Sequence, residues 1–287
     1  MKKLLLVLPI VLAAMSCSKS STSASQQPAA LSGQQIINGQ PALDNPMTPS
    51  VVGLFVKYSG SGVNGVWLQW CTGSVISPKL ILTAAHCVAD LQASDIKINF
   101  SGKSVTSQTQ MNPATRINDV STVFETRQVK AIEANPAYDG SGMHDLALLS
   151  LESDAPVTAV PVTLLPEKYL NKVANQTTFE GQTKPVLLIG FGLIDENNST
   201  ETDVIRSTVV PAQFLNNFVV TDQTVGSGGC NGDSGGPAFV QIDGVYFQTG
   251  VTHGPHGSSS TCHETGEWVN PALDAEFLAA AKRKLIP

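Results

Sequence analysis

The chain has 287 residues, of which 42% are hydrophobic and 14% are charged, a balance typical of a globular protein and not of a disordered one. Aspartate and glutamate outnumber lysine and arginine by 23 to 17, and the basic residues do not gather into a patch. We therefore expect no nucleic-acid partner, because phosphate binding needs clustered cations. The length allows one large β domain or two small ones.

The first 17 residues have the pattern of an export signal. Two lysines precede an apolar run at residues 4–14, whose length fits the roughly 7–15 residues of a signal peptide and falls below the about 20 that span a bilayer. Cys17 follows small residues, which resembles a bacterial lipobox, although Ala14 stands where leucine is usual. We expect a lipid on Cys17 and an exported chain, either an outer-membrane or periplasmic lipoprotein or a protein secreted after processing. The alternative is an ordinary cleavage site beside an incidental cysteine.

The chain has five cysteines, an odd number that leaves one thiol to explain in an exported protein. If Cys17 carries a lipid, four cysteines remain, and these can form two disulfides in an oxidising compartment. Four cysteines allow three pairings. The short span between Cys71 and Cys87 suggests one bond within a loop, which leaves Cys230 and Cys262 for the other.

The rest of the chain predicts a flexible start, many strands and one helix. Residues 18–35 are rich in serine, glutamine and alanine, and we interpret them as a flexible tether or propeptide. Short apolar runs between turn residues, typical of strands in a sandwich or barrel, cover residues 51–58, 65–70, 74–76, 80–83, 95–100, 146–151, 186–189, 238–242 and 245–251. A helix is expected at residues 271–284, capped by Asn270 and with Pro271 in its first turn. Its apolar positions are Leu273, Phe277, Leu278 and Ala281.

The stretch CNGDSGGP at residues 230–237 is the most informative part of the chain. A nucleophilic serine needs a tight turn that exposes its hydroxyl, and the glycines on both sides of Ser234 permit such a turn. The backbone N–H groups of Gly232 and Ser234 are candidates for an oxyanion hole. By composition alone, a glycine-rich surface loop is the simpler interpretation.

Two further strings supply the partners that such a serine requires. A serine hydroxyl is a weak nucleophile near neutral pH and needs a base, for which histidine is well suited, and His86 lies in the string TAAHC. Asp145, in the string HDLALL, is a carboxylate that could hold the imidazole in one tautomer. Taken singly, His86 is a surface histidine beside a structural cysteine, and Asp145 is an acid at the edge of a strand.

The three strings, in the order His, Asp, Ser, resemble the motifs of the trypsin/chymotrypsin-like serine proteases. The strings IING at residues 36–39 and GFG at residues 190–192 resemble the mature N-terminus and the Gly-Trp-Gly of that family. The resemblance implies an all-β fold of two six-stranded antiparallel β-barrels, at about 36–160 and 161–270, with a C-terminal α-helix, in one protease domain at 36–287. It also implies a serine endopeptidase that acts on proteins or peptides without a cofactor. His86, Asp145 and Ser234 would form its catalytic triad, and Gly232 and Ser234 its oxyanion hole.

The resemblance also implies that the chain is made as a zymogen. In this family the freed α-amino group of the first mature residue pairs with the aspartate beside the nucleophile. These roles fall to Ile36 and Asp233, and the pairing supplies the partner that a buried carboxylate needs. Gln35 precedes Ile36 where a tryptic activation site has arginine or lysine, so the activating protease is left open.

The residues that match the family's specificity pocket are mostly small and neutral. Gly228 falls at the base of the pocket, and Gly254 and Gly266 fall in its walls. A neutral base argues against arginine or lysine, and small walls favour large apolar side chains. Thr252 stands where the family has a serine near the triad aspartate, and His253 where it has tryptophan. Because a histidine in the pocket favours acidic side chains, that preference stays open as an alternative.

Other readings of the same residues lead to different functions. The spacing of His253, His256, Cys262 and His263 fits no zinc pattern, so we expect no metal. A surface protein on the same fold that binds without cleaving is the second hypothesis, because fold alone does not fix function. An esterase is the third, since the same triad cleaves esters. A monomer is the default expectation.

The sequence makes one prediction about processing. Cleavage after Gln35 would separate the protease domain from a lipid on Cys17, so we expect a membrane-held precursor whose activation also releases it. Mass spectrometry of the active protein should find a chain that begins at Ile36. Active protein that still begins at a lipidated Cys17 would contradict this hypothesis.

Overall fold

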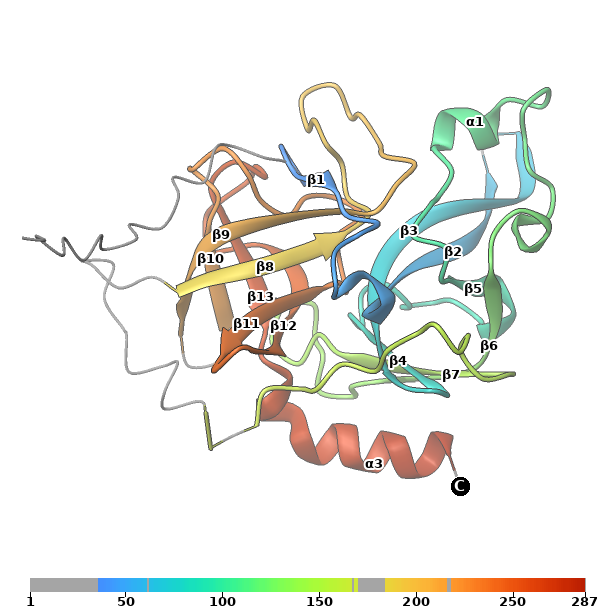
Figure 1. Cartoon of the computed structure of the whole chain (residues 1–287). Coiled ribbons are helices and arrows are strands. Elements are labelled where there is room, and N and C mark those ends of the chain that lie inside the picture. The colour runs from blue at the N-terminus through green and yellow to red at the C-terminus, as the bar shows by residue number, and fades with distance from the viewer. Residues whose placement is uncertain (1–35, 61, 167, 170–183, 216–217, 287) are drawn as a thin grey trace, which may run out of the picture. The chain divides into compact units, whose positions relative to one another are not determined.

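The structure is a computed structural model that describes residues 36–286 apart from residues 61, 167, 170–183 and 216–217 (Figure 1). The predicted export signal at residues 1–17, the lipid site Cys17 and the tether at residues 18–35 lie outside the described residues and stay predictions. The described chain forms two six-stranded antiparallel barrels followed by a C-terminal helix, which confirms the predicted fold class.

The first barrel closes in the order β2-β3-β4-β7-β6-β5 and lies on the right of Figure 1. Its strands are β2 (Val51–Gly60), β3 (Val63–Ser77), β4 (Leu80–Thr83), β5 (Ile96–Asn99), β6 (Thr126–Ala134) and β7 (Ala147–Leu151). Its interior is filled by branched aliphatic side chains that are fully buried, including Val52, Leu54, Ile81, Ile98 and Leu148. Because these residues lose all contact with water, they provide the main hydrophobic stabilisation of this half.

The second barrel has the order β9-β10-β13-β12-β11-β8, with β8 paired back to β9 and the short β1 (Gln40–Pro41) added outside β9. Its strands are β8 (Lys184–Gly190), β9 (Arg206–Phe214), β10 (Phe218–Asp222), β11 (Pro237–Ile242), β12 (Val245–Pro255) and β13 (Thr265–Val269). Trp268 and Ile36 pack together in its core and are almost completely buried. The residue that follows the proposed cleavage site is therefore an interior residue of this barrel.

The C-terminal helix leaves the second barrel and packs on the first. Asn270 caps a 3-10 turn at Pro271–Asp274 by accepting a hydrogen bond from the Ala272 N–H, and α3 (Ala275–Leu285) follows. Leu278, Ala281 and Leu285 face the core of the first barrel. Leu273, expected on the buried face, is instead exposed, because the 3-10 turn changes the helical phase before α3 begins.

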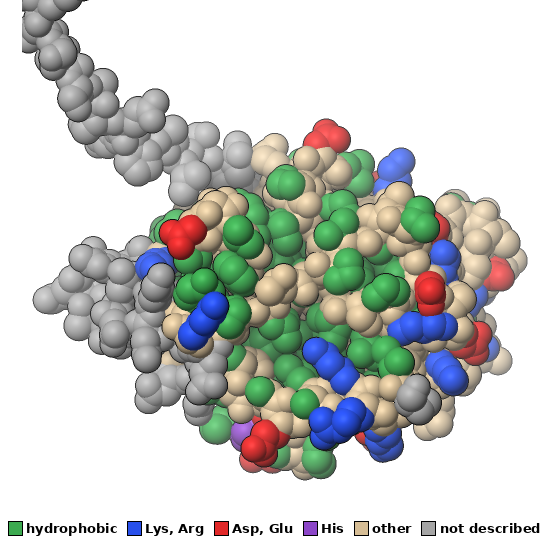
Figure 2. Space-filling view, turned by 60° about the horizontal axis from the view of Figure 1, so that its bottom comes forward, with side chains coloured by type: hydrophobic (Ala, Val, Ile, Leu, Met, Phe, Trp, Pro, Cys, Tyr) green, Lys and Arg blue, Asp and Glu red, His purple; other side chains and the backbone are tan. Residues whose placement is uncertain are grey.

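The remaining helical segments are short and lie in connections. They are the 3-10 turns Thr48–Ser50, Ala93–Asp95 and Val120–Thr122 and the helix α1 (Ser107–Met111). On the face that carries α3, lysine and arginine side chains are interspersed with acidic and apolar ones (Figure 2). Within the described residues, no helix combines the length and apolar character needed to cross a membrane.

Two disulfides fix loops that border the candidate site. Cys71 of β3 is joined to Cys87, the residue after His86, and Cys230 is joined to Cys262 across the loop that precedes β13. These are the bonds expected from the cysteine spacing. Disulfides persist in oxidising compartments, which fits an exported protein.

Candidate active site

Ser234 lies on the loop between β10 and β11, and this loop is held tightly against the first barrel. The Ser234 carbonyl accepts a hydrogen bond of 2.8 Å from the Thr72 N–H of β3. Gly235 has a φ of +77°, and any side chain there would overlap the Thr83 hydroxyl and the Thr72 carbonyl. Only glycine fits at this position, which explains why the loop needs its Ser-Gly-Gly sequence.

The same loop leaves two backbone donors without partners. Gly232 has a φ of +100°. Two hydrogen bonds fix the peptides next to it, from the Asp233 N–H to the Cys230 carbonyl and from the Gly235 N–H to the Thr252 carbonyl. In the described part of the chain, the N–H groups of Gly232 and Ser234 donate to no acceptor. An oxyanion hole needs two such free donors on a rigid turn.

His86 and Asp145 lie at the same edge of two neighbouring antiparallel strands of the first barrel. His86 follows β4, and Asp145 immediately precedes β7. The Asp145 carboxylate is fully buried and accepts two bonds from His86, one from its N–H at 2.8 Å and one from its Nδ1 at 2.6 Å. An ionised carboxylate only accepts hydrogen bonds, so Nδ1 carries the proton and Nε2 is left as the basic nitrogen.

The structure does not join Ser234 to His86. Among the described residues, the Ser234 hydroxyl makes no hydrogen bond with the His86 ring, and His86 Nε2 lies 3.7 Å from the Cys87 sulfur. Catalytic hydrogen bonds of this kind are often long without substrate and shorten when it binds. The serine–histidine hydrogen bond is therefore the one part of the predicted triad that the described residues do not form.

A second histidine reaches the same carboxylate. His253 Nδ1 lies 2.6 Å from Asp145 Oδ2, the oxygen that also binds His86 Nδ1. Burial alone would raise the pKa of Asp145, but the hydrogen bonds from His253 and His86 outweigh it and lower the pKa to about 2. The Thr252 hydroxyl donates its hydrogen bond to the Gly236 carbonyl at 2.9 Å and not to Asp145.

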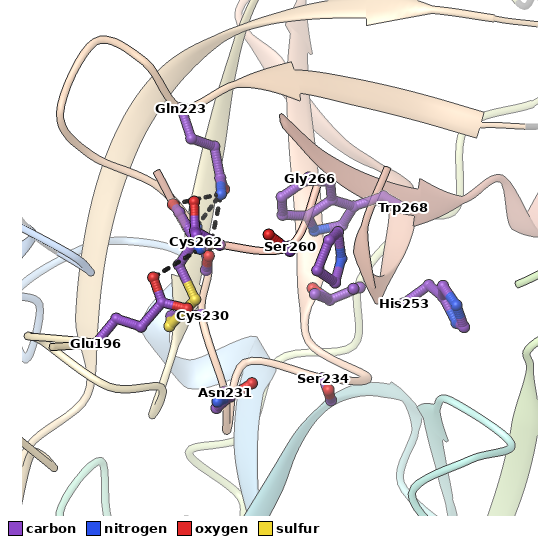
Figure 3. A pocket seen from close by; sticks show the side chains of 15 residues that line it. Glu196, Gln223, Cys230, Asn231, Ser234, His253, Ser260, Cys262, Gly266 and Trp268 are labelled. Carbon is purple, nitrogen blue, oxygen red and sulfur yellow. Dashed lines mark hydrogen bonds between the residues drawn. A yellow bond between two sulfur atoms is a disulfide. The ribbon is translucent and has the colours of Figure 1, made fainter. Parts of the chain in front are cut away.

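A cavity of about 210 Å³ opens beside Ser234 (Figure 3). Of the residues assigned to the specificity pocket, Thr252, His253, Gly254 and Gly266 line it. Gly228 does not, because it packs against the Gln223 side chain and its carbonyl accepts a 3.0 Å bond from the Ile37 N–H. Several lining residues were not predicted from the sequence, among them Glu196, Gln223 and Trp268, whose contacts are set only in three dimensions.

These three residues give the cavity a mixed character. Trp268 presents a large buried ring, and Gln223 is buried with its amide bonded to the Gly229 N–H and the Cys262 carbonyl. Glu196 lies beside the disulfide, away from His253 (Figure 3), and accepts a 2.9 Å bond from the Cys262 N–H. The cavity therefore combines an aromatic surface with one carboxylate.

Asp233 lies between the nucleophile and the second barrel and is enclosed on all sides. Its carboxylate accepts the N–H groups of Gly192 and Cys230 at 2.8 and 2.9 Å. Burial raises the pKa of Asp233 to about 7, against the opposing effect of these two bonds. A carboxylate in this position favours a positive partner, which an ammonium group would supply.

The metal-ligating residues of the region do not form an independent site. His86, Asp145 and His253 bring three ligand atoms within 4.8 Å of one another, but both histidines already use Nδ1 to bind the carboxylate. His256 Nδ1 binds Glu267 at 2.6 Å instead. The other candidate groups contain cysteines that are in disulfides and offer no thiolate.

Comparisons with known proteins agree with this geometry. Chymotrypsin-like elastase family member 1 of Canis lupus familiaris is 25% identical to this chain, over 66% of this chain and 71% of the elastase. Brachyurin of Leptuca pugilator is 28% identical, over 68% of this chain and 79% of brachyurin. Clotting factor C of Tachypleus tridentatus is 28% identical over 71% of this chain, which spans only 21% of that relative. The model of the Trypsin family matches residues 36–265. The chain therefore belongs to the trypsin family of serine proteases.

Proposed function

We propose that the chain is a serine endopeptidase in which His86, Asp145 and Ser234 form the catalytic triad. The observation that carries this proposal is the buried Asp145 carboxylate, which fixes His86 by two hydrogen bonds at the junction with the Ser234 loop. A buried ionised group is costly unless it is paired, so this arrangement is unusual outside a functional site.

The proposed reaction transfers an acyl group first to the serine and then to water. His86 Nε2 takes the proton of the Ser234 hydroxyl as the serine oxygen bonds to the peptide carbonyl carbon. The carbonyl oxygen becomes an oxyanion that the N–H groups of Gly232 and Ser234 stabilise. The carbon–nitrogen bond then breaks as His86 returns the proton to the leaving amine. Water attacks the acyl ester, gives a proton to His86, and releases the acid as Ser234 regains its hydrogen.

Activation is proposed to depend on Asp233. Ile36 is buried in the second barrel, and the neighbouring Ile37 is tied to Gly228 on the loop that leads to the nucleophile. Cleavage before Ile36 creates an ammonium group in this region, and we propose that it pairs with the Asp233 carboxylate. Since the Gly232 turn adjoins Asp233, the pair would order the oxyanion donors. The predicted lipid on Cys17 would then be separated from the active domain.

The preferred residue before the cleaved bond is proposed to be large and apolar, and not arginine or lysine. The Trp268 ring and the Cys230–Cys262 disulfide supply apolar surface in the cavity, and Gly228 carries no charge. The Glu196 carboxylate is partly satisfied by the Cys262 N–H and lies 3.9 Å from His263 Nε2. An acidic preference remains the alternative, because His253 also lines the cavity.

Removal of the nucleophile tests the proposed reaction. Ser234→Ala should lower the kcat for peptide substrates by on the order of 10⁶-fold, the loss found for the nucleophile of another serine protease. Ser227→Ala is the matched control, because it removes a buried hydroxyl on the same loop. Turnover that survives in Ser234→Ala would exclude this triad. Ester cleavage without peptide cleavage in the wild type would favour an esterase, and full biological activity in Ser234→Ala would favour the binding protein.

The raised pKa of Asp233 predicts how pH affects the uncleaved chain. The pKa of Asp233 is 3.8 in the unfolded chain and about 7 in the folded chain. Between these two pH values the folded chain binds more protons than the unfolded one. The stability that Asp233 contributes is therefore complete below this range and is lost as the pH rises through it. The loss is at most about 1.4 kcal/mol per pH unit. In urea unfolding at pH 5 and 7.5, Asp233→Asn should show less of this decline, whatever its absolute stability. Equal declines in both chains would contradict the assignment.

A library of peptides tests the cavity. The specificity constant kcat/KM should be at least roughly 10-fold higher for peptides with phenylalanine, tyrosine or leucine before the cleaved bond than for peptides with arginine or lysine there. Glu196→Gln is the informative variant, because it removes the charge and keeps the size. Preference for arginine or lysine in the wild type would contradict the proposal, and loss of that preference in Glu196→Gln would identify Glu196 as its cause.

A further inference from the structure

The triad aspartate has two imidazole partners, and they come from different barrels. His86 belongs to the first barrel, whereas His253 lies on β12 of the second. Both rings place Nδ1 2.6 Å from the same oxygen, Asp145 Oδ2, and their centroids lie 5.6 Å apart at an interplanar angle of 87°. The Asp145 side chain is 0% exposed, while the two rings are 29% and 21% exposed.

This geometry fixes the hydrogens on both rings. Asp145 is ionised, because its pKa is about 2, and it can therefore only accept. Each Nδ1 must donate to it, so His253 is held in the same tautomer as His86 and has Nε2 as its remaining proton acceptor. The hydroxyl of Thr252, the neighbouring residue, is bonded to the Gly236 carbonyl. His253 thus provides a second side-chain donor to the triad carboxylate.

A second carboxylate faces the other side of the His253 ring. A Cβ placed on Gly142, whose φ is +88°, would lie 2.6 Å from Glu267 Oε1 and 3.1 Å from His253 Nε2, so both atoms border the same small space. Glu267 is nearly buried on β13 and also binds His256 Nδ1 at 2.6 Å. The ring of His253 therefore lies between Asp145 and Glu267.

We infer that His253 is a positioning residue of the triad, whose protonation competes with that of His86 for the charge of Asp145. This inference rests on the proposed function. With His253 neutral, Asp145 fully stabilises the imidazolium that His86 becomes during the reaction. With His253 charged, Asp145 is already paired with a cation, and the second positive charge on His86 is disfavoured.

The charged groups around His253 favour its protonation in mildly acidic solution. The hydrogen bond to Asp145 raises the pKa of His253, burial opposes this, and the charges of Asp145 and Glu267 raise it further. The other titratable groups near this cluster are His86, His256, which shares Glu267, and Tyr138, whose own pKa is raised first by burial and then by Asp145. Two linked protonations, and not one, therefore govern the acidic side of the activity.

The pH dependence of kcat/KM tests the inference. On a logarithmic plot, wild-type activity should fall below neutral pH in two steps, and its slope should exceed 1 and reach 2 at pH values below both protonations. His253→Gln, whose amide can still donate to Asp145 but does not titrate, should fall with a slope of 1, and so should His253→Phe. His263→Gln is the control and should keep the wild-type slope, because the His263 ring pairs with Glu196, at 3.9 Å, and not with Asp145. A slope of 1 in the wild type, with the same midpoint in His253→Gln, would overturn the inference.

A second measurement does not depend on turnover. Proton NMR of the wild type at neutral pH should show low-field imidazole N–H signals, two of which come from the Nδ1 atoms that donate to Asp145. His144 and His256 also hold Nδ1 against a carboxylate, so the two signals are assigned by substitution. His253→Gln should lose one signal, and His86→Ala should lose the other. A spectrum in which His86→Ala removes a low-field signal and His253→Gln removes none would overturn the inference. Two signals in a protein without peptidase activity would refute the proposed function and leave the His253–Asp145 contact established.

Discussion

The buried carboxylate of Asp145 is the interaction on which the site depends. It lies at the start of β7 in the first barrel, yet its donors come from both halves of the molecule, His86 from the first barrel and His253 from the second. A buried charge that loses one partner is strongly destabilised, so the contact constrains how the barrels meet. Thr72 adds a second link by binding the Ser234 carbonyl of the opposite half. Ser234, His86 and Asp145 can meet only when the two barrels are packed together.

Asp233 is the second buried carboxylate, and its environment differs from that of Asp145. Asp145 receives donors from two imidazoles, and its pKa falls to about 2, whereas Asp233 receives two backbone donors and its pKa rises to about 7. The pKa values differ because burial is outweighed by the imidazole hydrogen bonds at Asp145, whereas at Asp233 burial outweighs the two backbone hydrogen bonds. One acid is therefore bonded to two imidazoles, and the other to two backbone N–H groups. The processing step proposed above would act on Asp233 and leave the His86–Asp145 pair unchanged.

The sequence was most informative where chemistry depends on consecutive residues. The strings around Ser234 and His86 and the helix after Asn270 were predictable, because turns and caps are local.

Strands β6, β9, β10 and β13 were not anticipated. Pro211 argues against a central strand in β9, and β6 contains charged residues on its outward side. The contacts of His253 with Asp145 and of Glu196 with Cys262 join residues far apart in the chain, so no local pattern could show them. Gly228 matched the family's pocket base by alignment, but Gln223 separates it from the cavity.

The most direct test is labelling with a fluorophosphonate, which reacts only with an activated serine, followed by mass mapping of the modified residue. A chain that begins at Ile36 should be compared with the unprocessed chain. The account predicts a label on Ser234 in the chain that begins at Ile36 and little or none in the unprocessed chain. A label on a different serine, or none in either chain, would contradict the claim that His86, Asp145 and Ser234 assemble into a working triad.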